Sequence, residues 1–128
     1  MLIVRCLSDE ALDRLLPATI ARGLLPIVEV ASETEAELAL KAGATTIGVN
    51  ARDLDTLDMR PDRAAAILRG LPKHITKLHL SGIAKAEDVR KVFDGPADAA
   101  LIGETLMRQD DPEPLLRSLV AAASPGSV

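Results

Sequence analysis

Residues 24–50, LLPIVEVASETEAELALKAGATTIGVN, place an apolar run, an amphipathic stretch and a second apolar run in series. Both apolar runs have the length of a β-strand, and the stretch between them is typical of a helix with one apolar face. Ser32 and Glu35 have the spacing of a capping box at the start of that helix, and Gly43 marks its end. The stretch therefore predicts a strand, a helix and a second, parallel strand.

The same alternation covers most of the 128 residues. Apolar runs of strand length begin at about residues 2, 24, 45, 75 and 98. We expect helices over residues 8–23, 32–43, 61–70 and 84–93 and from residue 112 onward, the first with a kink or restart at Pro17. These five βα units predict one α/β domain over residues 1–122, followed by a disordered tail over residues 123–128.

Five parallel units fit either an open, doubly wound sheet or part of a closed barrel. Units of about 20 to 30 residues are enough for a small open sheet, whereas a complete (β/α)8 barrel usually takes ~250 residues. The periodicity does not choose between the two, and the length of the chain favours an open, flavodoxin-like sheet.

The composition argues against several classes of function. The chain has one Phe, no Trp, no Tyr and a net charge of -4, so we expect neither base stacking nor binding to nucleic acid. One Cys and two His give no metal-ligand spacing, and we expect no metal or other cofactor. The opening apolar run is too short for a signal peptide or a membrane span, which predicts a cytoplasmic protein without a membrane partner. Cys6 in that run is expected to be a small buried hydrophobe.

Polar residues gather where the predicted strands end, which is where parallel α/β folds bind ligands. Glu29 lies between two valines, so its carboxylate needs either an ion pair with a Lys or Arg of a neighbouring strand or a wet, functional cavity. Asn50 ends the third strand and can offer an amide donor to a substrate. Arg52 and Asp53 follow it, and we expect them to pair with each other and brace the loop.

Two strands end in glycine turns, Gly82 in KLHLSGI (residues 77–83) and Gly103 in LIGETLM (residues 101–107). A glycine at such a turn lets backbone N–H groups approach an anion, or it simply supplies a positive φ for a tight turn. Two neighbouring units that end in this way resemble a phosphate cradle built from consecutive strand ends.

Longer stretches carry a family resemblance. The residues LPIVEVASETEAELALKAGATTIGVNARDLDTL (25–57), SGI (81–83) and DAALIGETLMRQDDPEPLL (98–116) resemble the C-terminal portion of indole-3-glycerol-phosphate synthase, the (β/α)8 enzyme of tryptophan biosynthesis. The resemblance runs to about Ala121 and replaces the flavodoxin-like expectation. It implies that the five units are strands four to eight of a TIM barrel, a half-barrel that oligomerisation, most simply as a homodimer, would complete.

The resemblance also implies a reaction and a set of site residues. The family closes an anthranilate-derived ribulose phosphate into indole-3-glycerol phosphate with loss of carbon dioxide and water, so the expected partner is a phosphorylated small molecule. Glu29 matches a catalytic carboxylate, and Asn50 matches a substrate-positioning amide. The matching phosphate-binding turns contain Ser81, Gly82, Gly103 and the backbone at Glu104.

Two departures from the family leave several functions open. Leu80 replaces a family carboxylate before Ser-Gly, and strand alternation puts His79 on the opposite face, toward the helices. Nothing in the chain matches the family's first three strands, which supply its lysines. The chain is therefore a half-size synthase completed by another copy or another chain, a non-catalytic relative that binds a phosphorylated metabolite or regulates an assembly, or an incomplete chain.

Overall fold

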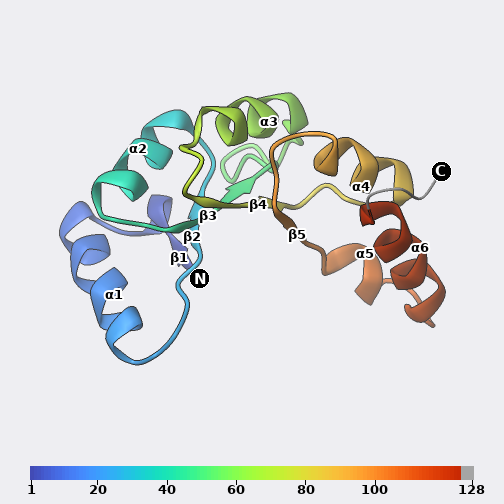
Figure 1. The fold of residues 1–128 in the computed structure, drawn as a ribbon, viewed down its shortest axis with the longest axis horizontal. Helices are drawn as coiled ribbons and strands as arrows, with labels where there is room; N and C mark the ends of the chain where they lie inside the picture. The colour runs from blue at the N-terminus through green and yellow to red at the C-terminus, as the bar shows by residue number, and fades with distance from the viewer. Residues whose placement is uncertain (125–128) are drawn as a thin grey trace.

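The computed structural model describes residues 1–124 and contains a single sheet of five parallel strands in the order β1-β2-β3-β4-β5. Figure 1 shows the strands along the inner side of an open arc, with α1 to α4 on its outer side and α5 and α6 at the end opposite α1. The predicted partial barrel is confirmed, whereas its completion by oligomerisation stays a prediction. Residues 125–128, most of the predicted tail, lie outside the described residues.

Helices and strands alternate along the whole described chain. The strands are β1 (Leu2–Ile3), β2 (Val28–Val30), β3 (Thr46–Asn50), β4 (Thr76–Leu80) and β5 (Ala99–Leu101). The helices are η1 (Val4–Cys6), α1 (Asp9–Ala21), α2 (Glu33–Lys41), α3 (Pro61–Gly70), α4 (Ala86–Phe93), α5 (Glu104–Met107) and α6 (Glu113–Ala123).

Side-chain caps fix the starts of the first two long helices. Ser8 Oγ accepts a hydrogen bond from the Ala11 N–H, and Ser32 Oγ accepts one from the Glu35 N–H, both at 3.2 Å. The return bond of the predicted capping box shifts by one residue, because Glu35 Oε2 accepts from the Ala31 N–H at 2.7 Å. Helix α1 continues through Pro17, so the restart predicted there is wrong.

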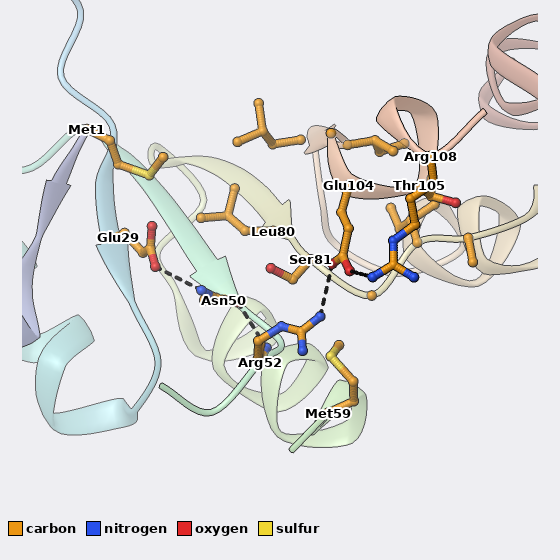
Figure 2. A pocket seen from close by; sticks show the side chains of 16 residues that line it. Met1, Glu29, Asn50, Arg52, Met59, Leu80, Ser81, Glu104, Thr105 and Arg108 are labelled. Carbon is orange, nitrogen blue, oxygen red and sulfur yellow. Dashed lines mark hydrogen bonds and ion pairs between the residues drawn. The ribbon is translucent and has the colours of Figure 1, made fainter. Parts of the chain in front are cut away.

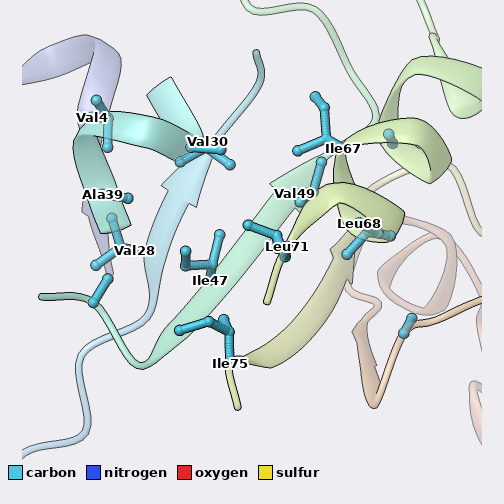
Figure 3. Packing of buried hydrophobic residues seen from close by; sticks show 14 of the residues in the cluster. Val4, Val28, Val30, Ala39, Ile47, Val49, Ile67, Leu68, Leu71 and Ile75 are labelled. Carbon is cyan, nitrogen blue, oxygen red and sulfur yellow. The ribbon is translucent and has the colours of Figure 1, made fainter. Parts of the chain in front are cut away.

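The two faces of the sheet have different chemistry. Ile47 and Val49 of β3 point away from the concave side and are completely buried beneath the helices (Figure 3). Burying one such side chain contributes roughly 1.5–3 kcal/mol to stability. Because side chains alternate along a strand, Gly48 of β3 and Leu80 of β4 lie on the opposite, concave face. A Cβ on Gly48 would lie only 2.7 Å from Leu80 Cδ1. Leu80 therefore packs directly over Gly48, and the helix-facing core holds the strands in place beneath the concave face.

The first apolar run departs from its predicted form. It pairs as a strand only at Leu2 and Ile3, and the next three residues form a single 3-10 turn. This turn ends the strand alternation, so Val4 is buried while Cys6 is exposed. The expectation of a buried Cys6 is wrong for that reason. Among residues 1–124, no helix combines the length and the hydropathy that a membrane span requires.

Candidate functional site

A pocket of about 620 Å³ opens on the concave side of the arc, at the carboxyl ends of the strands. The six site residues predicted from the sequence all line it, although they come from β2, β3 and the turns after β4 and β5: Glu29, Asn50, Ser81, Gly82, Gly103 and Glu104. Figure 2 shows their side chains and those of their neighbours around this space. Parallel strands bring these positions together because their carboxyl ends meet at one edge.

The floor of the pocket contains a buried carboxylate-amide pair. Asn50 Nδ2 donates a hydrogen bond to Glu29 Oε1 at 2.8 Å, and Asn50 Oδ1 accepts one from the Arg52 N–H at 2.9 Å (Figure 2). The two bonds fix which end of the Asn50 amide faces Glu29. Within residues 1–124, Glu29 makes no ion pair with Lys or Arg, so the alternative of an ion pair with a neighbouring strand is wrong.

Glu29 and Asn50 each keep a hydrogen-bonding group that no described residue occupies. Glu29 and Asn50 are 7% and 8% exposed, yet both reach the pocket. Glu29 Oε2 receives no hydrogen bond from the described residues, and it is not among their buried unsatisfied atoms. One carboxylate oxygen and the second amide hydrogen therefore remain available for a ligand.

The turn after β4 has an unusual backbone. Ser81 has φ 68° and Gly82 has φ 78°, so two consecutive residues lie in the left-handed region. For Ser81 this conformation is strained, and such strain is found at ligand sites more often than elsewhere. A Cβ on Gly82 would meet only the terminal methyl group of the flexible Met59 side chain, which can move aside, so glycine is needed here for its φ.

The turn after β5 is open. Gly103 has φ -132° and ψ -60°, and no atom lies within 4 Å of the position that its Cβ would take. Its lack of a side chain therefore keeps the pocket open instead of relieving strain. No protein acceptor in residues 1–124 takes the N–H of Gly82 or of Gly103.

Two amides at the start of α4 already have a protein partner. Asp88 Oδ2 accepts hydrogen bonds from the N–H groups of Ala84 and Lys85, at 3.0 and 3.2 Å. These two amides are therefore not available to an anion, because the side chain of Asp88 caps them. The amide available here belongs to the Ser81–Gly82 turn itself.

Arg52 and Asp53 do not pair with each other. Arg52 Nη2 reaches across the pocket to Glu104 Oε2 at 3.2 Å, and Arg108 Nη2 contacts Glu104 Oε1 at 2.7 Å (Figure 2). Asp53 accepts a hydrogen bond from the Asp55 N–H and pairs with Arg63 at 3.0 Å, interactions that lower its pKa to about 2. Asp53 therefore braces the loop as predicted, but with other partners.

Sequence reasoning missed the two arginines as pocket residues. Arg108 lies four positions after Glu104, a spacing at which helical side chains meet, so the pair was open to prediction. The contact between Arg52 and Glu104 spans 52 positions, and no local pattern indicates it. Leu80 lines the pocket, while His79 lies on the helix-facing side, as the strand alternation predicts.

Comparisons with known proteins agree on one family. The family model described as indole-3-glycerol phosphate synthase matches residues 1–119. Indole-3-glycerol phosphate synthases of Mycobacterium ulcerans (strain Agy99) and Mycobacterium tuberculosis (strain CDC 1551 / Oshkosh) are each 42% identical to the chain over 124 residues, which is 97% of it. The chain spans only 46% of the length of these relatives.

Solved structures with low sequence identity to the chain have the same fold. A structure described as "Native KDPGal structure" has a TM-score of 0.65 over 91% of this chain and 54% of its own. One described as "Crystal structure of Amycolatopsis orientalis BexX/CysO complex" has a TM-score of 0.68 over 93% of this chain and 48% of its own. Both are 22% identical to the chain, so they support the arrangement of strands and helices and nothing more.

Proposed function

The chain belongs to the indole-3-glycerol phosphate synthase family, and we propose that its pocket binds an anthranilate-derived ribulose phosphate and supports lyase chemistry on it. In that chemistry the indole ring closes, and carbon dioxide and water leave. The observation that carries the proposal is the 2.8 Å bond between Asn50 and Glu29 on the floor of a pocket whose far side is formed by two glycine turns.

Glu29 and Asn50 take the catalytic and positioning roles. Among the described residues, Asn50 alone donates a hydrogen bond to Glu29, which leaves one carboxylate oxygen able to accept a proton from a ligand in the pocket. The second Asn50 amide hydrogen can bind a ligand hydroxyl or carbonyl oxygen. Because Asn50 also accepts from the Arg52 backbone, its side chain is already oriented before a ligand arrives.

The phosphate would lie between the Ser81–Gly82 turn and the Gly103–Glu104 turn. The free N–H groups of Gly82 and Gly103 line this part of the pocket and can donate to phosphate oxygens. Arg52 and Arg108 bring positive charge to the same side, although both now pair with the Glu104 carboxylate. We expect modest affinity, since these exposed pairs must rearrange before the arginines can contact a phosphate.

The pocket lacks an obvious proton donor. Among the described residues that line it, the ionisable side chains are Glu29, Arg52, Glu104 and Arg108. Leu80 occupies the position of a family carboxylate, between Asn50 and the β5 end. Ring closure and dehydration need a general acid, and its absence typically costs about 10² to 10⁴ in rate. We therefore expect slow turnover by the chain alone.

We propose further that two copies associate through the ends of the arc. The strands β1 and β5 are the two edges of a wholly parallel sheet, so β5 of one copy can lie beside β1 of the other in the same direction. Exposed apolar side chains are found on the first and last elements of the arc: Ile20 in α1 with Leu24 and Leu25 after it, and Leu101 in β5 with Leu116 and Val120 in α6. A closed ring of two copies would hold ten strands and surround a wider cavity than an eight-stranded barrel.

The lyase activity is tested by following indole-3-glycerol phosphate fluorescence with the purified chain, the Glu29→Gln variant and the Leu80→Glu variant. Glu29→Gln preserves the acceptor for Asn50 and removes the base, so we expect turnover to fall about 10² to 10⁴-fold from a slow wild-type rate. Unchanged turnover in Glu29→Gln would exclude Glu29 from the mechanism. If only Leu80→Glu is active, the chain is a relative that binds the phosphorylated ligand without turning it over.

A further inference from the structure

A buried histidine directly precedes the Ser81–Gly82 turn. His79 is 6% exposed, lies beside Val49 in the sheet register, and faces the helices instead of the pocket. Its Nε2 atom lies 3.0 Å from the backbone carbonyl oxygen of Ser81. A carbonyl oxygen can only accept a hydrogen bond, so Nε2 carries the proton and the ring donates.

This hydrogen bond controls the direction of the peptide group between Ser81 and Gly82. No peptide bond in the described residues is cis, so the Gly82 N–H points opposite to the Ser81 carbonyl across a planar group. The carbonyl is held on the helix-facing side by His79, whereas Leu80, Ser81 and Gly82 line the pocket. The Gly82 N–H is consequently turned toward the pocket.

The turn needs an external support of this kind. Ser81 has φ 68°, a conformation that is unfavourable for a residue with a Cβ, so other contacts must hold it there. The Gly82 N–H has no acceptor within residues 1–124 and is free to bind a ligand. Burial lowers the pKa of His79, which keeps the ring neutral near pH 7 and compatible with a single protonated nitrogen.

We propose that His79 is a positioning residue that holds the Ser81 carbonyl and thereby aims the Gly82 N–H at the anionic group of the ligand. His79 does not contact the ligand itself. The identity of the anion as a phosphate rests on the proposed function, whereas the contact between the ring and the carbonyl does not.

The binding test compares wild type, His79→Leu and His79→Gln in a titration with inorganic phosphate. Leucine fills a similar volume but cannot donate, so phosphate affinity should fall about tenfold, the effect of one hydrogen bond to a charged acceptor. Glutamine can place an N–H near the position of Nε2, and affinity should stay within about twofold of wild type. Equal affinity in wild type and His79→Leu would overturn the proposal.

A spectroscopic readout separates this inference from the proposed function. Nitrogen NMR of the wild-type ring should show Nε2 protonated and Nδ1 bare, and the Gly82 amide signal should move in His79→Leu but not in His79→Gln. A ring protonated at Nδ1 alone, or a Gly82 signal that ignores both substitutions, would refute the role of His79. If wild type binds no phosphate, the proposed function fails at this site. The signals of the His79 ring and of the Gly82 amide still show whether His79 donates to the Ser81 carbonyl. If His79→Leu does not fold, the wild-type ring decides the contact, since protonation at Nδ1 alone would exclude donation to the Ser81 carbonyl.

Discussion

Asn50 Nδ2 donates to Glu29 Oε1 at 2.8 Å across two adjacent strands, and this bond is the only protein partner of the Glu29 carboxylate within residues 1–124. The register pairs Glu29 with Gly48, so the side chain of Asn50, two positions further along β3, reaches back to the carboxylate. Two buried polar side chains thus compensate each other on a face that is otherwise largely apolar.

We expect Asn50→Leu to lower the free energy of unfolding by about 1–3 kcal/mol, since it leaves both Glu29 and the Arg52 N–H without their partner. Urea denaturation of the variant and of wild type measures the difference. Glu29→Gln is the matched control, because its side-chain oxygen still accepts from Asn50. An unfolding curve for Asn50→Leu that coincides with wild type would show that the pair contributes nothing to stability.

The two glycine turns should respond differently to substitution. Gly103→Val has open space for its side chain and should abolish phosphate binding by filling the pocket, while the far-UV circular dichroism stays unchanged. Gly82→Val must adopt φ 78°, a backbone conformation that a β-branched residue rarely accepts, so we expect it to lose stability as well as binding. Phosphate titrations and thermal melts of both variants distinguish these effects. Phosphate binding that survives in Gly103→Val would place the anion elsewhere.

Self-association should depend on the edge strand β5. Leu101 lies on β5 and is 49% exposed, so Leu101→Lys places a charge at the predicted contact and should shift the chain toward monomer in sedimentation equilibrium at micromolar concentration. Leu57→Asn is the control, because Leu57 is also exposed but lies in the loop after β3, at φ 62°, which asparagine accepts. A wild type that sediments as a folded monomer would contradict the association through the arc ends.

Stability should depend on pH through His79. Burial holds the pKa of His79 below its ordinary value of 6.5, so between these two pKa values the unfolded chain binds a proton that the folded chain does not. The free energy of unfolding should therefore decrease as the pH falls from 6.5 toward the folded-state pKa, and the contribution is fully present above 6.5. In His79→Gln this part of the pH profile, measured by urea denaturation between pH 8 and 5 in steps of about 0.5, should be flat. An equal slope in both proteins would assign the effect to other groups.

Local patterns were sufficient to predict most of the scaffold. The cap at Ser32, the helix end near Gly43 and the alternation around Glu29 all depend on residues within a few positions of one another, and all are present in the structure. The prediction that polar residues gather at the strand ends drew attention to Glu29 and Asn50, and the two side chains meet in the structure.

Two features that sequence reasoning missed depend on tertiary contacts. Arg52 pairs with Glu104, 52 positions away, because two strand ends converge. The early end of β1 has a similar origin, since Arg5 pairs with Glu35 of α2 and Asp55 of the loop after β3. Propensity and spacing carry no information about such distant partners.

The most direct test of the phosphate-binding site is an amide NMR titration of the chain with the anthranilate-derived ribulose phosphate. We predict that the amide signals of Gly82, Gly103 and Glu104 move together and saturate, and that the Asn50 side-chain amide moves with them. Signals that stay in place, or that move only at residues outside the concave pocket, would contradict the claim that the strand ends form the binding site.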